Sequence, residues 1–145
     1  MLKKFLFLFY IIACAEIIMR VMAWITIIPD IELLNYANKF VRSSSVPGLQ
    51  FEHVPGARQN LMGREFWLNE FGHRGPPFPS SKSENERRIY FMGSSITLGW
   101  GVDQQEPFAA VTGRLLNKKL SPKTNRSYVS INSGVSNFNT SHMAA

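Results

Sequence analysis

The amino-terminal part of the chain contains one long apolar segment. Between residues 5 and 28 only three residues are not apolar: Glu16, Arg20 and Thr26. As an α-helix these 24 residues would extend about 36 Å, which is enough to cross the hydrocarbon core of a bilayer. Pro29-Asp30 closes the segment. The pattern therefore predicts an N-terminal transmembrane helix.

Insertion of this segment into a membrane is finely balanced. Its thirteen Leu, Ile, Phe and Val residues favour the bilayer by roughly 4 to 8 kcal/mol, and the central Glu16 and Arg20 nearly cancel that gain. These two residues lie four positions apart on one helical face, where pairing and snorkelling lower their cost. The segment either spans the bilayer or inserts through Ala15 and then lies along the interface.

The flanks of the segment indicate its topology. Lys3-Lys4 predict a cytoplasmic amino terminus. Ala13-Cys14-Ala15 also fits a signal-peptidase site, residues 11–14 resemble a lipobox with a lipidated cysteine, and a buried helix of a soluble protein is a further alternative. Because apolar sequence resumes directly after Glu16, an uncleaved anchor is favoured. It predicts a single-pass protein of the cell membrane, with residues from 44 onward outside the cytoplasm, in the periplasm or extracellular space.

The second half of the chain has the pattern of a strand, a helix and another strand. Residues 89–92 form a wholly apolar run, as expected of a strand buried on both faces of a parallel sheet, and Gly93-Ser94-Ser95 break it. Apolar residues then recur at helical spacing over residues 108–116. Residues 128–131 are a second β-prone run. The sequence predicts a right-handed parallel βαβ unit, with ligand sites at the carboxyl ends of its strands.

The stretch between the apolar segment and this unit is rich in turn-forming residues. Residues 43–63 contain clusters of Ser, Pro and Gly, which predict an extended linker with turns. Residues 64–69 fit a short strand, and residues 72–88 fit a surface loop. The predicted organisation is a membrane anchor over residues 1–30, a linker and pre-domain segment over residues 31–86, and an α/β domain over residues 87–145.

The composition excludes several kinds of functional site but says little about the fold. The chain has 145 residues, 45% hydrophobic and 18% charged, with a net charge of +6, as expected of one small globular domain. The single cysteine, Cys14, excludes an internal disulfide and a multi-cysteine zinc cluster. Basic residues occur only singly or in pairs, so nucleic-acid binding is not expected. The few histidines, His53, His73 and His142, limit the catalytic triads that can be built.

Ser95 is the best candidate for chemistry. A serine in a tight turn after a buried strand projects its hydroxyl above the sheet, where backbone N–H groups near a helix start stabilise an oxyanion. Alternatively, Ser94, Ser95 and Thr97 are only turn and cap residues. A phosphate cradle is another alternative, although neither GxxxxGK[ST] nor GxGxxG is complete. Trp100 either lines a substrate mouth or packs against the following helix.

Three stretches resemble elements of the SGNH (GDSL-type) hydrolase superfamily, in the family's order. Its first block, in which a buried strand ends at the nucleophilic serine, is similar to residues 88–102 (RIYFMGSSITLGWGV). An Asn-Ser-x-Gly-Phe-Arg-Gly element of membrane-anchored members is similar to residues 69–75 (NEFGHRG), and the second block to residues 131–140 (INSGVSNFNT). The resemblance implies a flavodoxin-like three-layer α/β/α fold with an incomplete parallel sheet, preceded by the transmembrane helix.

Carried over by position, the resemblance implies that Ser95 is the nucleophile and that the N–H groups of Ser95 and Gly134 belong to the oxyanion hole. Ser94 replaces the aspartate of the name-giving motif, and His73 replaces the usual phenylalanine. The third block, with its oxyanion asparagine, and the last block, Asp-x-x-His, have no counterpart, so the chain is interpreted as an amino-terminal portion of the domain. Glu70 and His73 have the Asp-x-x-His spacing, but structural or surface roles are expected for both.

The activity implied by the resemblance is acyl transfer to water by an esterase, lipase or other acylhydrolase, without a metal or organic cofactor. Acetylated envelope glycans and lipids are the implied substrate classes, and polysaccharide O-acetyltransferase activity is equally compatible. Without a histidine base, the chain alone is expected to hydrolyse esters poorly or not at all. The alternative from another class is a membrane-tethered binding module without catalysis.

Overall fold

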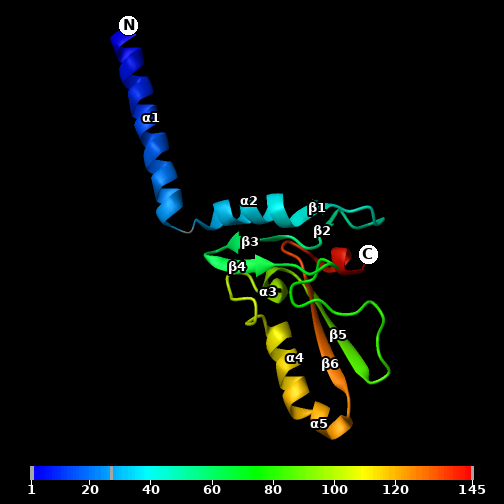
Figure 1. Ribbon diagram of the computed structural model, residues 1–145. Helices are drawn as coiled ribbons and strands as arrows, with labels where there is room; N and C mark the ends of the chain where they lie inside the picture. Colours follow the sequence, from blue (N-terminus) through cyan, green and yellow to red (C-terminus); the bar gives the residue numbers. More distant parts are fainter. Residues whose placement is uncertain (1, 27, 145) are drawn as a thin grey trace.

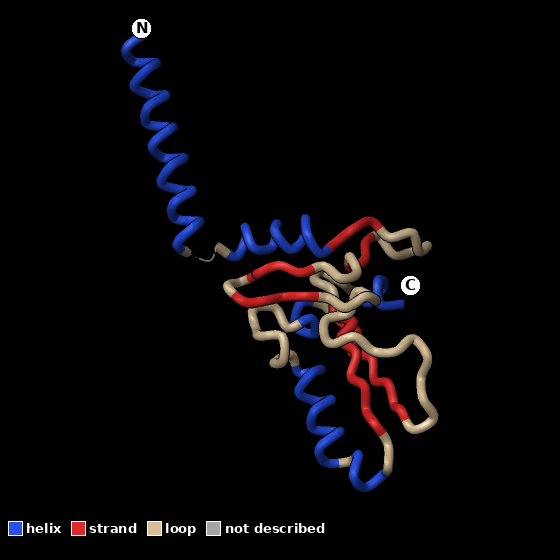
Figure 2. Tube along the Cα trace, viewed as in Figure 1, coloured by secondary structure: helices blue, strands red, loops and turns tan. Residues whose placement is uncertain are grey.

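A computed structural model describes residues 2–26 and 28–144. Within these residues, an apolar helix precedes a mixed α/β region with three two-stranded sheets (Figures 1 and 2). The elements in chain order are α1 (Leu2–Ile25), α2 (Pro29–Phe40), β1 (Val41–Ser43), β2 (Phe51–His53), β3 (Arg58–Leu61), β4 (Arg64–Trp67), β5 (Glu86–Gly93), α3 (Ser95–Leu98), α4 (Phe108–Lys119), α5 (Ser121–Thr124), β6 (Ser127–Gly134) and α6 (Thr140–Ala144).

Helix α1 is long and apolar enough to cross a membrane. It extends away from the rest of the chain, and none of its described residues is buried, which argues against a core helix of a soluble protein (Figure 1). The helix continues without a break past Ala15 to Ile25. Arg20 Nε donates to Glu16 Oε1 at 2.8 Å, so the pairing expected from the four-residue spacing is confirmed.

Residues 29–69 fold into a helix and two antiparallel hairpins. Pro29 begins α2 rather than only closing the apolar segment, because proline at the first helical position has a suitable fixed φ and lacks only an N–H that would be unpaired there. Strand β1 pairs with β2, and β3 pairs with β4. The extended linker expected over residues 43–63 is therefore wrong where β2 and β3 lie. The strand expected over residues 64–69 is confirmed by β4.

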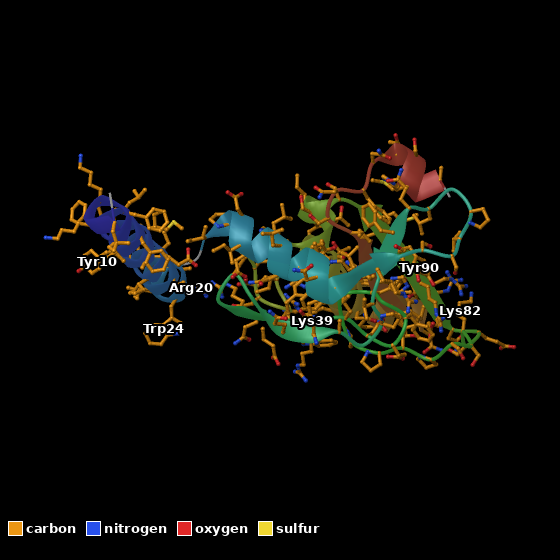
Figure 3. The ribbon with its side chains drawn as sticks, turned by 90° about the horizontal axis from the view of Figure 1, so that it is seen from above. Tyr10, Arg20, Trp24, Lys39, Lys82 and Tyr90 are labelled. Atoms are coloured by element: carbon orange, nitrogen blue, oxygen red, sulfur yellow. The ribbon has the colours of Figure 1, made fainter. Side chains whose placement is uncertain are left out.

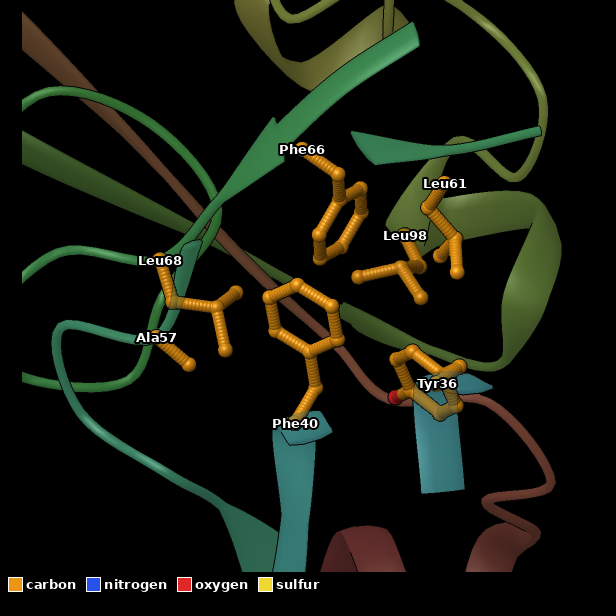
Figure 4. Packing of buried hydrophobic residues seen from close by; sticks show 7 residues of the cluster. All are labelled: Tyr36, Phe40, Ala57, Leu61, Phe66, Leu68 and Leu98. Carbon is orange, nitrogen blue, oxygen red and sulfur yellow. The ribbon is translucent and has the colours of Figure 1, made fainter. Parts of the chain in front are cut away.

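One apolar cluster joins this pre-domain region to helix α3 (Figure 4). Phe40 and Leu98 are fully buried, and the rings of Phe40 and Phe66 meet edge to face with centroids 4.8 Å apart. The buried members are Tyr36, Phe40, Ala57, Leu61, Phe66, Leu68 and Leu98. Burying one Leu or Phe side chain stabilises a fold by about 1.5–3 kcal/mol. Because the other members of the cluster come from residues 29–69, this region and α3 share one core.

Strands β5 and β6 are parallel and are connected through α4, which confirms the predicted strand, helix and strand. Helix α4 packs on one face of this sheet, where Phe91 meets Phe108 with ring centroids 5.5 Å apart. The prediction that β5 is buried on both faces is wrong, since Tyr90 is 52% and Met92 56% exposed. These two side chains alternate with Phe91 along the strand and so point to the face that α4 does not cover.

Candidate active site

Ser95 lies where strand β5 turns into helix α3. The strand ends at Gly93, Ser94 is extended with φ −89° and ψ −154°, and Ser95 is the first residue of the helix. Gly99 ends α3 in a left-handed conformation with φ 82°, which glycine adopts at little cost, and its N–H donates to the Ser95 carbonyl at 3.0 Å. The half-buried Ser95 thus occupies the carboxyl edge of the parallel sheet.

The parallel register brings Gly134 to the same edge. Gly134 is the register partner of Gly93, and the Val135 N–H donates to the Gly93 carbonyl at 2.9 Å. A Cβ atom at Gly134 would lie 2.3 Å from the amide nitrogen of Leu98, so only glycine allows this approach of β6 to α3. The Gly134 N–H donates to Asn132 Oδ1 at 3.0 Å. The Gly134 N–H could donate to an oxyanion only after the Asn132 side chain had turned away from it.

This close approach gives a direct test of the site's architecture. Gly134→Ala is expected to lower the free energy of unfolding by about 1–3 kcal/mol, because the added methyl group must displace the backbone of Leu98. Thermal unfolding of the detergent-solubilised chain, followed by circular dichroism, measures the change. Ser133→Ala is the neighbouring control, since it removes only a 3.2 Å contact with His73. Equal stability of the two variants would contradict the described approach of β6 to α3.

A cavity of about 320 Å³ adjoins Ser95. Its walls are mostly apolar, with Trp100 and Phe108 as the large side chains and Glu106 as the carboxylate. Ile96, directly after Ser95, is 82% exposed and also lines the cavity. The Trp100 ring meets Tyr36 edge to face at 5.3 Å between centroids, so Trp100 both lines the cavity and packs against α2.

Arg74 holds the backbone that follows Ser95. The side chain is buried, and its guanidinium donates to the carbonyls of Leu98 at 2.9 Å, of Gly99, and of Val102 at 2.7 Å. The same group lies 4.6 Å from the centroid of the Phe66 ring. Burial lowers the pKa of Arg74 to about 10, so the guanidinium stays charged at neutral pH. Arg74 therefore fixes the end of α3 and the loop after it.

The three histidines line a second cavity of about 390 Å³, which Ser95 does not border. His73 Nδ1 lies 3.2 Å from Ser133 Oγ, and burial lowers the pKa of His73. His142 lies in α6, and Glu70 is exposed. Within residues 2–26 and 28–144, no group of three or more His, Cys, Asp and Glu side chains is placed to hold a metal ion.

His53 belongs to a buried network that ties α2 to the end of β6. Its Nδ1 donates to the Gly72 carbonyl, 2.8 Å away, because a carbonyl oxygen only accepts. Nε2 therefore accepts from the Tyr36 hydroxyl at 2.7 Å, and that hydroxyl oxygen accepts the Ser136 N–H at 3.0 Å. Burial lowers the pKa of His53 to about 4. Both ring nitrogens are engaged, so His53 is not available as a base for Ser95.

Three residues that shape this region were not identifiable as functional from the sequence patterns: Tyr36, Arg74 and Asn132. Tyr36 and Ser136 are bonded across 100 positions, and Arg74 binds carbonyls 24 to 28 positions further along the chain. The periodicity of hydrophobic residues gives no information on bonds between residues so far apart in the chain. The one available signal was the position of Arg74 inside the motif NEFGHRG.

Searches for related proteins give no match, whether to a family model, to a curated protein or to a solved structure. Any assignment of function therefore rests on the geometry of the site together with the motifs of the sequence.

Proposed function

We propose that this chain carries the nucleophile of a membrane-anchored serine hydrolase of the SGNH type, with Ser95 as the nucleophile and the flavodoxin-like three-layer fold. One observation carries the proposal: the three stretches that resemble the family meet at one place. The parallel register sets Gly134, from the stretch of residues 131–140, beside the turn that leads to Ser95. Arg74, from the remaining stretch, binds the carbonyls at the end of α3.

The reaction would be acyl transfer from an ester to water. The Ser95 oxygen attacks the carbonyl carbon, the ester C–O bond breaks, and the alcohol leaves with the hydroxyl proton, which a base must carry. Water then hydrolyses the acyl-serine and restores the hydroxyl. The N–H groups of Ser95 and Gly134 would stabilise the oxyanion, once Asn132 releases Gly134. Since none of the described histidines, His53, His73 and His142, is bonded to Ser95, the chain by itself is expected to react slowly.

The walls of the Ser95 cavity favour an apolar acyl group. Trp100, Phe108 and Ile96 offer hydrophobic contact, whereas the Glu106 carboxylate disfavours an anionic group beside them. Esters of lipids and acetyl esters of envelope glycans both present an apolar acyl group at the reacting carbon. The apolar lining also suits a binding module that lacks catalysis, and the Ser95-dependent reaction described next separates the two functions.

The anchor gives the proposed enzyme its location. With α1 across the membrane and Lys3-Lys4 on the cytoplasmic side, the region from residue 44 onward would face the periplasm or the extracellular space. Substrates would then be esters of the cell envelope.

The proposal predicts slow but specific reaction of Ser95 with a fluorophosphonate. The full chain in detergent micelles is incubated with the probe, with and without imidazole as an external base, and the adduct is located by peptide mass spectrometry. We expect one adduct, on Ser95, that forms several-fold faster with imidazole, because the added base replaces the missing histidine. Ser95→Ala should abolish it.

Two serine variants serve as matched controls. Ser94→Ala changes the adjacent residue, whose side chain makes no cap hydrogen bond to α3, and should retain labelling. Ser133→Ala removes the hydroxyl beside His73 and should also retain it. An adduct on Ser133, or no adduct above that of the Ser95→Ala chain even with imidazole, would overturn the assignment of Ser95 and support the binding module.

A further inference from the structure

Helix α2 has two faces with different surroundings. Its inner face places Tyr36 and Phe40 in the buried cluster, with exposures of 2% and 0%. With a turn of 100° per residue, Ile31, Leu34 and Asn38 lie on the opposite face. On that outer face Leu34 is 62% and Ile31 is 39% exposed. The outer face of α2 thus presents two aliphatic side chains, Ile31 and Leu34, beside the polar Asn38, and no described part of the chain covers them.

The same outer face is turned toward the side from which α1 extends. In Figure 1, α1 rises from one side of α2, and strands β3 to β6 lie on the other side. Figure 3, seen from above, shows α2 lying over the rest of the domain. A bilayer crossed by α1 would therefore face the outer side of α2, with the domain beyond it.

Chain length sets how far from the bilayer α2 can begin. Helix α1, with 24 residues, is about 36 Å long and matches a hydrocarbon core of about 30 Å, so its carboxyl end reaches the interface. Trp24, which is 90% exposed, is near that end and suits the headgroup level. The four steps from Ile25 to Pro29 extend at most about 14 Å. The first turn of α2 therefore begins in or directly beside the headgroup layer.

From these observations we infer that α2 is an interfacial helix, whose outer face rests on the same lipid bilayer that α1 crosses. Ile31 and Leu34 enter the boundary between headgroups and acyl chains, and Tyr36 and Phe40 hold the domain beneath. With Asp30 and Glu32 in its first turn and Lys39 in its last, α2 offers no net attraction to anionic lipids, so the contact depends on its aliphatic side chains. This inference rests on the proposed membrane anchor.

The contact also orients the proposed active site. Leu98 of α3 belongs to the same cluster as Tyr36 and Phe40, and Trp100 beside the Ser95 cavity packs on Tyr36. A helix fixed on the membrane would hold that cavity close to the bilayer instead of on a freely tumbling tether. Esters in or near the lipid surface would be the accessible ones.

Site-specific quenching tests the contact in the full chain. Single cysteines are introduced at Leu34→Cys and, as a control at the far end of the domain, Lys123→Cys, both in a Cys14→Ala background. Each is labelled with an environment-sensitive fluorophore, and the protein is reconstituted into phosphatidylcholine vesicles with or without a nitroxide on the lipid headgroup. We expect position 34 to lose about half of its emission to the quencher and position 123 almost none, because an interfacial face lies within about 5–10 Å of the nitroxide layer.

A third labelled position separates this inference from the anchor on which it rests. Ile17→Cys, in the middle of α1, should be quenched by phosphatidylcholine that carries its nitroxide deep in the acyl chain. Quenching at 17 with no more at 34 than at 123 would overturn the interfacial helix alone. Absence of quenching at 17 would overturn the anchor and the inference together. A blue shift at position 34 that depends on protein density and not on the nitroxide would indicate a second copy of the chain, and would also overturn the inference.

Discussion

Arg74→Met is expected to lower the free energy of unfolding by about 3 kcal/mol or more. Methionine keeps much of the apolar volume beside Phe66 but removes the charged donors, which leaves the carbonyls of Leu98, Gly99 and Val102 without these partners. Hydrogen bonds from a charged group to a buried acceptor are worth about 1.5–3 kcal/mol each, and they are only partly additive. Chemical denaturation of the detergent-solubilised chain measures the loss.

Arg74→Met should disturb the turn around Ser95 more than it destabilises the whole fold. Because Arg74 holds the backbone from Leu98 to Val102, its loss frees the end of α3, and fluorophosphonate labelling of Ser95 is expected to fall at temperatures where the fold persists. Arg58→Met is the matched control, since Arg58 is an exposed arginine on β3 that pairs with Glu65. Exposed pairs contribute little. Equal destabilisation by the two substitutions would mean that the buried guanidinium does not organise the turn.

The βαβ unit was predictable because its signals are local. Residues 89–92 are an uninterrupted apolar run, and residues 108–116 repeat at helical spacing, so each element could be inferred from a few neighbours in the chain. The exposure of Tyr90 and Met92 was not predictable in this way. An apolar run reports that a strand is suited to burial, but which of its faces is covered depends on how many elements pack against it.

Most strands of the pre-domain region were not predictable, because their signals are not local. Strands β1 to β4 have three or four residues each, too few for a clear period-2 pattern, and charged residues such as Arg58 and Glu65 point outward from them. Their stability comes from Phe40 and Phe66, which meet from distant parts of the chain. A proline after an apolar segment favours its end, but proline is equally suited to begin a helix, as Pro29 does for α2. Tertiary contact, not local preference, orders residues 29–69.

In the candidate site, too, residues with local signals were predictable and residues that act through long-range bonds were not. Ser95 could be named from its strand, its turn and its motif, all of which are local. The residues that support it, Arg74 and Tyr36, act through bonds to distant backbone groups and carry no pattern of their own. Motifs therefore locate a nucleophile more readily than they locate the groups that position it, since those groups bind to main-chain atoms that any residue supplies.

Acidification should destabilise the fold through His53. The imidazole is buried with a pKa of about 4, whereas an unfolded histidine has a pKa near 6.5. Between these values the unfolded state binds more protons than the folded state, so the free energy of unfolding falls as the pH decreases from about 6.5 to about 4. Above pH 6.5 the contribution of His53 to stability is fully present. The loss attributable to His53 is about 3 kcal/mol across this range. Its main physical origin is burial, which disfavours the charged imidazole, and a protonated ring also cannot accept from the Tyr36 hydroxyl.

Denaturation curves at a series of pH values measure this dependence, with His53→Gln as the decisive variant. His53→Gln should be less stable than the parent at pH 7, because the network from Tyr36 to Gly72 is disturbed, yet its stability should change much less between pH 6.5 and 4. A smaller slope of the same sign is expected to remain, since burial also lowers the pKa of His73. Tyr90→Phe, which removes an exposed hydroxyl, should leave the slope intact. An undiminished slope in His53→Gln would show that other groups bind the protons, and that the bonds from His53 to Tyr36 and Gly72 do not set the acid limit of the fold.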